Sequence, residues 1–347
     1  MIRILSEQDV ERLIEPGAAI AAMEDAYRRH SAGRMPPPGR LDVQRGEPKG
    51  SVLVLAGHSD GRLFAMKGNM HVYPEPGSRH RKAASMMLLW DAVQCAPLAL
   101  IATTRFNNHR TAAGLAAAAR HLARKDARTL AVFGAGKIAP AVIRYLALVR
   151  PFKRVSLVGR GSQRSTDLAN TLRREAAFAA CDVRALTDPA AAVQDADVVV
   201  TITTADAPVF PGGAVQPGAL VILAGANRPQ AREADDELMA RAQVYVDHRG
   251  GSVERAGDIC IPLRSGRLRD EQIVGEIGDL IAGATPVPRA DVTVFKSMGI
   301  IAQDLALAEL VVDRAARDGI GVELDIETGL CRAANAAILS GPALAER

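Results

Sequence analysis

The sequence has few aromatic residues, few cysteines and no long apolar run. Aromatic residues make up 3% of the 347 residues, whereas 48% are hydrophobic, so we expect a core built from alanine, valine, leucine and isoleucine. The cysteines Cys95, Cys181, Cys260 and Cys331 lie far apart in the chain, without a CxxC motif or a paired-histidine spacing. We therefore expect reduced thiols and no metal site.

Charge and hydropathy argue against two further classes of protein. The net charge is only +4, and basic residues are interspersed with acidic ones, which is untypical of a nucleic-acid-binding surface. No N-terminal segment joins a basic start to an apolar run, and no stretch approaches the roughly 18 consecutive apolar residues of a membrane span. We expect a soluble, cytoplasmic protein that binds neither nucleic acid nor a membrane.

The first third of the chain predicts a helix, a sheet and a second helix. Residues 3–30 have apolar residues near helical spacing. Two apolar runs within residues 51–66 flank His58-Ser59-Asp60-Gly61, where Asp-Gly is a strong hairpin signal. Further apolar runs at 86–92 and 97–103 extend this into a sheet of consecutive antiparallel strands, and the alanine-rich segment 111–123 predicts a buried helix.

From Thr129 to about Thr293 the pattern changes to short apolar runs that alternate with helical or turn-rich stretches. Such alternation is typical of a parallel, doubly wound sheet. Helical spacing after Ser297 predicts a last helix that returns to the first domain. We therefore predict an α/β protein in which a Rossmann domain, residues 124–299, is inserted between the two parts of an α+β substrate-binding and oligomerisation domain, residues 1–123 and 300–347.

A glycine fingerprint follows the apolar run at 129–133. Gly134 and Gly136 permit a tight turn and a close approach of the backbone, and Ala139 is small where helix and strand must pack. With Lys137 and Ile138 they would bind a dinucleotide pyrophosphate at the start of the next helix. The predicted strand before the fingerprint and the helix after it favour this interpretation over a purely structural turn.

The end of the second predicted strand indicates the cofactor. An acidic residue there binds the ribose hydroxyls of NAD, but this chain has Arg160, followed closely by Arg164. Two guanidinium groups suit a 2′-phosphate, unless they are solvated arginines of a surface loop. We expect NADP(H) in preference to NAD(H), with NAD(H) left open.

Strings along nearly the whole chain resemble the ornithine cyclodeaminase/mu-crystallin family. In order, they are FAMKGN around Lys67, NNHRTAA around Arg110, Thr201-Ile202-Thr203, PVF at 208–210, GANRP at 225–229, YVD at 245–247 and VFKSMG at 294–299. Members bind small amino or imino acids beside a nicotinamide, and they include cyclodeaminases, alanine-type dehydrogenases and ketimine reductases. The resemblance also implies a homodimer formed through the N-terminal sheet.

The resemblance implies roles for individual residues. Arg110, assisted by Arg40, would bind the substrate carboxylate, because a planar guanidinium grips a carboxylate bidentately. Lys67 would be the proton donor, with a pKa lowered by partial burial beside two arginines. The alternatives are a surface ion pair for Arg40 and an exposed strand-end lysine for Lys67. Ser297 and Ala226 would contact the cofactor.

Other positions leave alternatives open or depart from the family. Thr201 and Thr203 would line the nicotinamide or simply end a strand. Asn227 replaces an aspartate that the cyclodeaminases use as a base; it can still hydrogen-bond an imine nitrogen, or it is a turn residue. Lys82, in the basic string 79–82, replaces a threonine; the string is either a solvated loop or a site for a second anionic group of the substrate.

Together these features predict an NAD(P)H-dependent reductase of a small 2-imino acid, or the reverse amino-acid dehydrogenase, with hydride transfer at the α carbon. One alternative is a cyclodeaminase-type deaminase or lyase that uses bound NAD, which the asparagine at 227 disfavours. Another is a non-catalytic NADPH-binding protein, which Lys67 and Arg110 disfavour.

Overall fold

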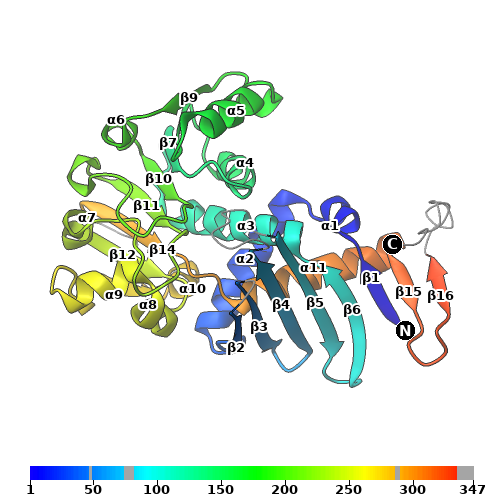
Figure 1. Cartoon of the computed structure of the whole chain (residues 1–347). Coiled ribbons are helices and arrows are strands. Elements are labelled where there is room, and N and C mark those ends of the chain that lie inside the picture. The colour runs from blue at the N-terminus through cyan, green and yellow to red at the C-terminus, as the bar shows by residue number, and fades with distance from the viewer. Residues whose placement is uncertain (47–48, 74–81, 286–289, 334–347) are drawn as a thin grey trace.

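The computed structural model describes residues 1–46, 49–73, 82–285 and 290–333. The described residues form two eight-stranded sheets with helices between and around them (Figure 1). The mixed sheet has the strand order β16-β15-β1-β6-β5-β4-β3-β2, and the parallel sheet has the order β13-β12-β14-β11-β10-β7-β8-β9. Because the strands of the parallel sheet all come from the middle of the chain, the predicted Rossmann fold inserted into an α+β unit is confirmed.

The mixed sheet contains a meander of antiparallel strands. Its strands are β1 (Ile2–Leu5), β2 (Gly39–Arg45), β3 (Gly50–Ser59), β4 (Leu63–Val72), β5 (Lys82–Asp91), β6 (Ala96–Ala102), β15 (Val322–Leu324) and β16 (Cys331–Ala333). The strands β2 to β6 pair consecutively and antiparallel. Asp60 and Gly61, at the predicted hairpin turn, both have positive φ, 47° and 67°, and the Arg62 amide closes the turn by donating to the Ser59 carbonyl oxygen at 2.8 Å.

The predicted helix over residues 3–30 is wrong at its start. Ile2–Leu5 form β1, which pairs parallel to β6 and antiparallel to β15, so long-range pairing overrides the local helical spacing. Helix α1 (Glu7–Leu13) begins after Ser6, whose side chain forms a capping box with Asp9, and α2 (Pro16–Ser31) begins with a proline in its first turn.

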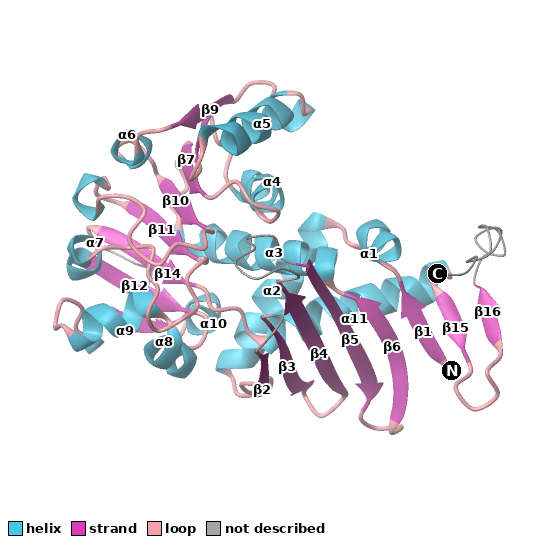
Figure 2. Ribbon diagram, viewed as in Figure 1, coloured by secondary structure: helices cyan, strands magenta, loops and turns pink. Residues whose placement is uncertain are grey.

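Helices cover only one face of the mixed sheet. In Figure 2, α2 and α11 (Ile301–Asp318) lie behind its strands, α1 and α3 (Thr104–Leu122) lie at the upper ends of the strands, and no described helix lies in front. Helix α11 packs on α2, α3 and β3, which confirms the predicted return of the last helix. The uncovered side, which we call the open face, exposes Leu41, Val43, Phe64, Met66, Met70 and Met86.

The parallel sheet is doubly wound. Its strands are β7 (Thr129–Phe133), β8 (Arg154–Val158), β9 (Asp182–Leu186), β10 (Val198–Thr201), β11 (Ala219–Leu223), β12 (Ala242–Val246), β13 (Ile273–Glu276) and β14 (Val292–Lys296). The chain builds β7, β8 and β9 outward and then returns to β10 on the other side of β7. The order of the strands therefore reverses between β7 and β10, where ligands bind in folds of this kind.

Helices flank the parallel sheet. They are α4 (Ala139–Val149), α5 (Ser162–Arg173), α6 (Pro189–Val193), α7 (Asp236–Arg241), α8 (Arg249–Arg255), α9 (Gly257–Arg264) and α10 (Ile277–Ile281), with short 3-10 helices at Ala176–Phe178, Gly212–Ala214 and Asp270–Gln272. Within the described ranges, no helix combines the length and the apolar character that a membrane crossing requires.

Candidate active site

The predicted cofactor residues follow strands that end at one level. Val158, Phe133, Thr201, Leu223 and Lys296, the last residues of β8, β7, β10, β11 and β14, are register neighbours across the parallel sheet. The residues after them therefore share the carboxyl edge of the sheet, around the point where the strand order reverses. This edge gathers the glycine fingerprint, Arg160, Thr203, Ala226 and Ser297.

The glycine turn has the geometry of a phosphate-binding loop. Gly134 has φ 111°, and a Cβ there would lie 2.7 Å from the Ile202 carbonyl oxygen at the end of β10, so only glycine fits. A Cβ on Gly136 would meet no atom within 4 Å, which leaves open space beside the backbone. No side chain caps the N-terminus of α4, whose N-cap is Ile138, and Ala139 is fully buried. These features fit a dinucleotide pyrophosphate.

The arginines after β8 are exposed at the same edge. Arg160 extends from β8 toward the segment after β10, where its guanidinium donates a hydrogen bond of 3.3 Å to the Thr204 hydroxyl. Arg164 lies exposed in the first turn of α5, whose N-terminus has no side-chain cap. No acidic residue ends β8 or directly follows it, in agreement with the sequence analysis.

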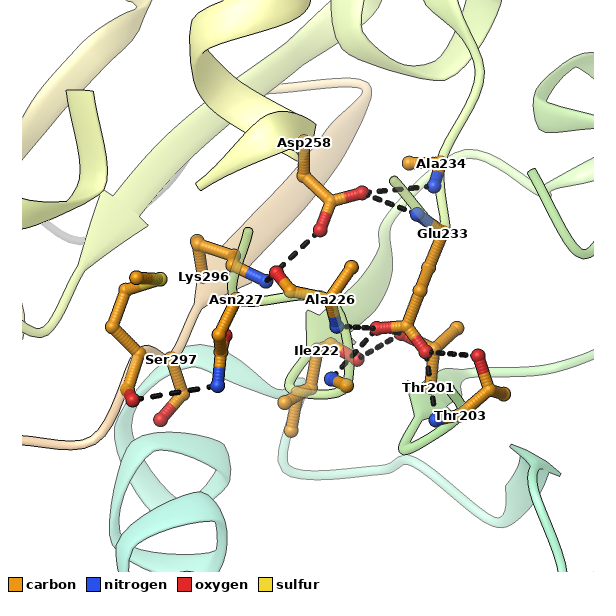
Figure 3. A network of polar contacts seen from close by, with 12 residues as sticks. Thr201, Thr203, Ile222, Ala226, Asn227, Glu233, Ala234, Asp258, Lys296 and Ser297 are labelled. Carbon is orange, nitrogen blue, oxygen red and sulfur yellow. Dashed lines mark hydrogen bonds and ion pairs between the residues drawn. The ribbon is translucent and has the colours of Figure 1, made fainter. Parts of the chain in front are cut away.

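A buried carboxylate, Glu233, organises the loops after β10 and β11 (Figure 3). It accepts hydrogen bonds from both threonine hydroxyls, Thr201 and Thr203, each at 2.7 Å, and from the amides of Gly225 and Ala226 at 2.7 and 3.1 Å. The threonine hydroxyls therefore point at Glu233, and they fix the ends of the strands on which a cofactor would lie.

A buried lysine joins the GANRP loop to the VFKSMG strand. Lys296 donates to the Ala226 carbonyl oxygen at 2.6 Å and to Asp258 at 2.9 Å (Figure 3). The second oxygen of Asp258 accepts from the amides of Glu233 and Ala234 at 2.6 and 3.0 Å. Lys296 and Asp258 are fully buried, and each charge is paired, as burial in the interior demands.

Asp247 holds the turn that follows β14. Its carboxylate accepts from the amides of Met298 and Gly299, both at 2.7 Å, and from the Ser297 hydroxyl at 3.3 Å. Burial raises the pKa of Asp247, and the donated amide hydrogen bonds lower it in part. Asn227 reaches the same turn, where its side-chain amide donates to the Met298 carbonyl oxygen at 3.5 Å. The tertiary structure thus brings Asn227 and Ser297 together.

Lys67 lies inside β4, buried at 1% exposure, and not at the end of a strand. Its ammonium donates to Asp304 of α11 at 2.6 Å and to the side-chain oxygen of Asn107 of α3. The pKa of Lys67 is lowered to about 8: burial lowers it most, Asp304 partly opposes this, and the nearby charge of Arg110 also lowers it. A lysine with such a pKa can give and take a proton near neutral pH.

Arg110 meets the same carboxylate. Helix α3 begins at Thr104 and not near residue 111 as predicted, because the distant Glu7 accepts from the amides of Thr104 and Arg105 at 2.9 and 2.7 Å. Arg110 therefore lies within the helix. Its Nε is 3.3 Å from the Asp304 carboxylate.

Its guanidinium also packs on the turn after β14, because a Cβ on Gly299 would lie only 2.7 Å from the Arg110 Nη1. Gly299 has φ 78°, so this position favours glycine for its backbone conformation as well. The close packing brings the guanidinium from the helix layer of the mixed sheet to the carboxyl edge of the parallel sheet.

Arg40 faces the same side of the mixed sheet as Lys67. The register pairs Arg40 with Leu55 and Leu55 with Lys67, so the three share a face, and two strand spacings place Arg40 about 10 Å from Lys67. Arg40 is exposed and lies 3.5 Å from Asp42.

Lys82 pairs with Val72 and lies on the open face with Met86, away from Lys67. Its register position therefore does not bring it to the cluster around Lys67. Residues 79–81 of the predicted basic string lie outside the described residues.

Sequence reasoning missed the carboxylates that organise this site: Asp304, Asp247 and Glu233. One signal was available for Asp304, because it lies on the apolar stripe of its helix, between Ile301 and Ala308 at helical spacing. A charge on a buried stripe needs a partner of opposite sign, and Lys67 is that partner.

Comparisons with known proteins agree with this geometry. The profile of the ornithine cyclodeaminase/mu-crystallin family matches residues 2–319. The Delta(1)-pyrroline-2-carboxylate reductase of Paracoccus denitrificans is 33% identical over 292 residues, which are 83% of this chain and 91% of that protein. The ketimine reductase mu-crystallin of Mus musculus is 35% identical over 227 residues, 65% of this chain and 68% of that protein.

A solved structure, Thermococcus litoralis Delta(1)-pyrroline-2-carboxylate reductase in complex with NADH and L-proline, superposes with a TM-score of 0.85. It is 25% identical in sequence, and the match covers 93% of this chain and 100% of that chain. The family profile includes the glycine turn, the Lys67 and Arg110 cluster and the turn after β14. The chain therefore belongs to the ornithine cyclodeaminase/mu-crystallin family.

Proposed function

We propose that the protein is an NAD(P)H-dependent reductase of a small 2-imino acid, or an amino-acid dehydrogenase in the reverse direction. One observation carries the proposal: a buried lysine with a pKa of about 8 and an arginine converge on Asp304 beside the carboxyl edge of a Rossmann sheet. The reductases of pyrroline-2-carboxylate and of ketimines among its relatives support it.

In this proposal Arg110 binds the carboxylate of the imino acid, since its guanidinium forms paired hydrogen bonds to a carboxylate. The Asp304 carboxylate, 3.3 Å from the Arg110 Nε, and Gly299 orient the guanidinium. Arg40 faces the same side of the mixed sheet and adds a second positive charge for an anionic substrate. Asn227 hydrogen-bonds the substrate nitrogen or carboxylate, but an amide cannot act as the base that ring closure needs.

A bound reduced nicotinamide supplies the hydride to the carbon of the C=N bond. Lys67 supplies the proton: its Nζ gives one hydrogen to the substrate nitrogen, so the product is the amino acid and the lysine is left neutral. Burial stabilises the neutral amine, because desolvation disfavours the charged form. Asp304 and Asn107 hold the Nζ in place while the proton moves.

The residues that would hold the cofactor lie along the carboxyl edge. The amides around Gly134, Gly136, Lys137, Ile138 and Ala139 would bind the pyrophosphate. Thr203, Ala226 and Ser297 would surround the nicotinamide, and Thr201, which is fully buried, would support them from behind through Glu233. Arg160 and Arg164 would bind the 2′-phosphate that distinguishes NADP(H) from NAD(H). We therefore propose NADP(H) as the preferred cofactor.

The cofactor preference is tested by Arg160→Ala. Losing a hydrogen bond to a charged group, about 1.5–3 kcal/mol, should raise the KM for NADPH by about tenfold or more and leave that for NADH nearly unchanged. Arg174→Ala, an exposed arginine at the other end of α5, is the control. Equal effects on the two cofactors would argue for NAD(H) or for a merely structural arginine.

The activity is tested with purified protein, NADPH or NADH, and a panel of imines. The panel contains pyrroline-2-carboxylate, piperideine-2-carboxylate, iminosuccinate and 2-oxoacids mixed with ammonia or methylamine. We expect loss of the reduced-nicotinamide absorbance with at least one imine, at a rate that falls about 10²–10⁴-fold in Lys67→Met. Failure of every imine with both cofactors, at high enzyme concentration, would overturn the proposal.

We also propose that the protein is a homodimer joined through the open face. Residues 1–123 with 300–347 would form the substrate-binding and oligomerisation domain, and 124–299 the dinucleotide-binding domain. Water would otherwise contact six large apolar side chains on the open face, whose exposed fractions lie between 48% for Met66 and 60% for Leu41. Met66→Asp with Met86→Asp should yield monomers in analytical ultracentrifugation, whereas an unchanged dimer would exclude this face.

A further inference from the structure

A second cluster of polar side chains lies at the far end of the carboxyl edge of the parallel sheet. His248 follows β12, Glu276 ends β13, and His30 comes from α2, which covers the mixed sheet. One ligand atom of each residue lies within 4.8 Å of those of the other two. We call His30, His248 and Glu276 the histidine cluster; it joins the parallel sheet to helix α2, which covers the mixed sheet.

Hydrogen bonds fix the orientation of His30. It is buried at 6% exposure, and its Nδ1 lies 2.6 Å from the Met35 carbonyl oxygen. A carbonyl oxygen only accepts, so Nδ1 carries the hydrogen and Nε2 keeps its lone pair. Histidines that bind metals in proteins are oriented in this way, by donating the other ring N–H to a carbonyl or carboxylate.

Glu276 is held equally firmly. One carboxylate oxygen accepts from the Arg249 amide at 2.9 Å and lies 3.2 Å from the His248 Nδ1. The other accepts from the Ser31 hydroxyl at 3.0 Å. The separation of 3.2 Å between His248 and Glu276 is close to that of two ligands around one zinc ion, whose bonds are about 2.0–2.2 Å.

The backbone keeps the parts of the cluster together. A Cβ on Gly278, at the start of α10, would overlap the Tyr27 carbonyl oxygen and the Ser31 hydroxyl of α2. Helices α10 and α2 therefore touch directly, and Glu276 and His30 cannot separate without breaking this contact. The rings of His30 and His248 meet edge to face with centroids 5.1 Å apart.

We propose that the histidine cluster binds one zinc-type divalent cation, which links the parallel sheet to the helices of the mixed sheet. Two imidazoles and a carboxylate are a ligand set that zinc accepts, with water in the fourth position. His248 follows Asp247, the carboxylate that holds the Met298–Gly299 turn, so the cation would also rigidify the wall of the active site. The inference does not depend on the proposed reaction.

The test is titration of the full-length protein, after removal of metals with a chelator, with Zn²⁺ by calorimetry and with Co²⁺ by visible absorption. We expect one ion per chain and the visible bands of tetrahedral cobalt. His248→Ala and Glu276→Gln should weaken binding at least tenfold, since loss of even a supporting group at a metal site costs 10–100-fold in affinity. Zn²⁺ should raise the Tm of the wild type but not of His248→Ala.

His121→Ala is the matched control, because His121 lies 3.0 Å from Glu24 but belongs to no cluster of three ligand groups among the described residues. Circular dichroism checks that each variant is folded. The proposal is overturned if wild-type protein binds no ion at micromolar Zn²⁺, or if His248→Ala and His121→Ala bind as tightly as the wild type. The histidine cluster would then be a hydrogen-bonded contact between α2 and the parallel sheet.

Discussion

Lys67 and Asp304 form a buried ion pair of 2.6 Å although 237 positions separate them in the chain. Lys67 comes from the middle of β4, and Asp304 from the first turn of the helix that returns after the parallel sheet. The same carboxylate oxygen lies 3.3 Å from the Arg110 Nε. One carboxylate thus positions both the proposed proton donor and the proposed receptor of the substrate carboxylate.

The pKa of Lys67 predicts a pH dependence. With a pKa of about 8, Lys67 is protonated below that pH, so kcat/KM for imine reduction should be constant below about pH 8 and fall above it. Oxidation of the amino acid needs the neutral amine and should rise through the same pH. Lys67→Met should lose this titration and about 10²–10⁴-fold in rate. If the pH profiles of imine reduction and of amino-acid oxidation both show no change near pH 8, Lys67 is not the proton donor.

The same shift has a consequence for stability. The pKa of an unfolded lysine is about 10.4, so the folded state binds fewer protons than the unfolded state between about pH 8 and 10.4. The cost of burying a charged Lys67 is fully present below about pH 8 and is relieved as the pH rises through this window. The free energy of unfolding of the wild type, relative to Lys67→Met, should therefore rise there.

Asp304→Asn should shift the pH profile of kcat/KM for imine reduction to lower pH. Asp304 raises the pKa of Lys67, so its removal lowers that pKa, and the limb for reduction should move below pH 8. The KM for the imino acid should rise too, because Arg110 loses its partner. Asp313→Asn, on the exposed side of the same helix, is the control. A loss of thermal stability with an unmoved profile would show a structural role only.

Arg110→Lys should weaken substrate binding although the charge is kept. Lysine cannot form paired hydrogen bonds to a carboxylate, and losing a hydrogen bond to a charged group, about 1.5–3 kcal/mol, corresponds to a KM roughly 10–100-fold higher. Arg105→Lys, an exposed arginine in the first turn of α3, should leave the KM unchanged. Steady-state kinetics with an imine that has no carboxylate should show no difference between wild type and Arg110→Lys.

Lys296→Met should destabilise the fold. It leaves Asp258 buried without its cation, and breaking a buried ion pair in this way costs about 3–5 kcal/mol. Urea titration measures the free energy of unfolding. Lys296→Met with Asp258→Asn should recover much of the loss, because the asparagine oxygen still accepts the amides of Glu233 and Ala234. The control is Lys125→Met, at an exposed lysine. If it lowers the free energy of unfolding as much as Lys296→Met does, the unpaired Asp258 is not the cause.

Much of the parallel sheet could be predicted from the sequence. Strands buried on both faces appear as short apolar runs, and five such runs correspond to β7, β8, β10, β11 and β12. The meander of β3 to β6 was predicted from its apolar runs and the Asp-Gly turn. Strand β2 was missed although Leu41 and Val43 alternate with Arg40 and Asp42, because two apolar residues make too short a pattern to stand out. The start of α3 was missed because its cap, Glu7, comes from another helix.

The sequence by itself determined the glycine turn after β7, the apolar runs and the strings around Lys67 and Arg110, because these depend on steric and hydrophobic preferences over a few neighbouring residues. Only the tertiary structure decided that Asp304 is the partner of Lys67 and that His30 lies beside His248 and Glu276. Ion pairs and ligand sets act over a few ångströms, and that proximity arises only when the returning chain packs its helices against the sheets.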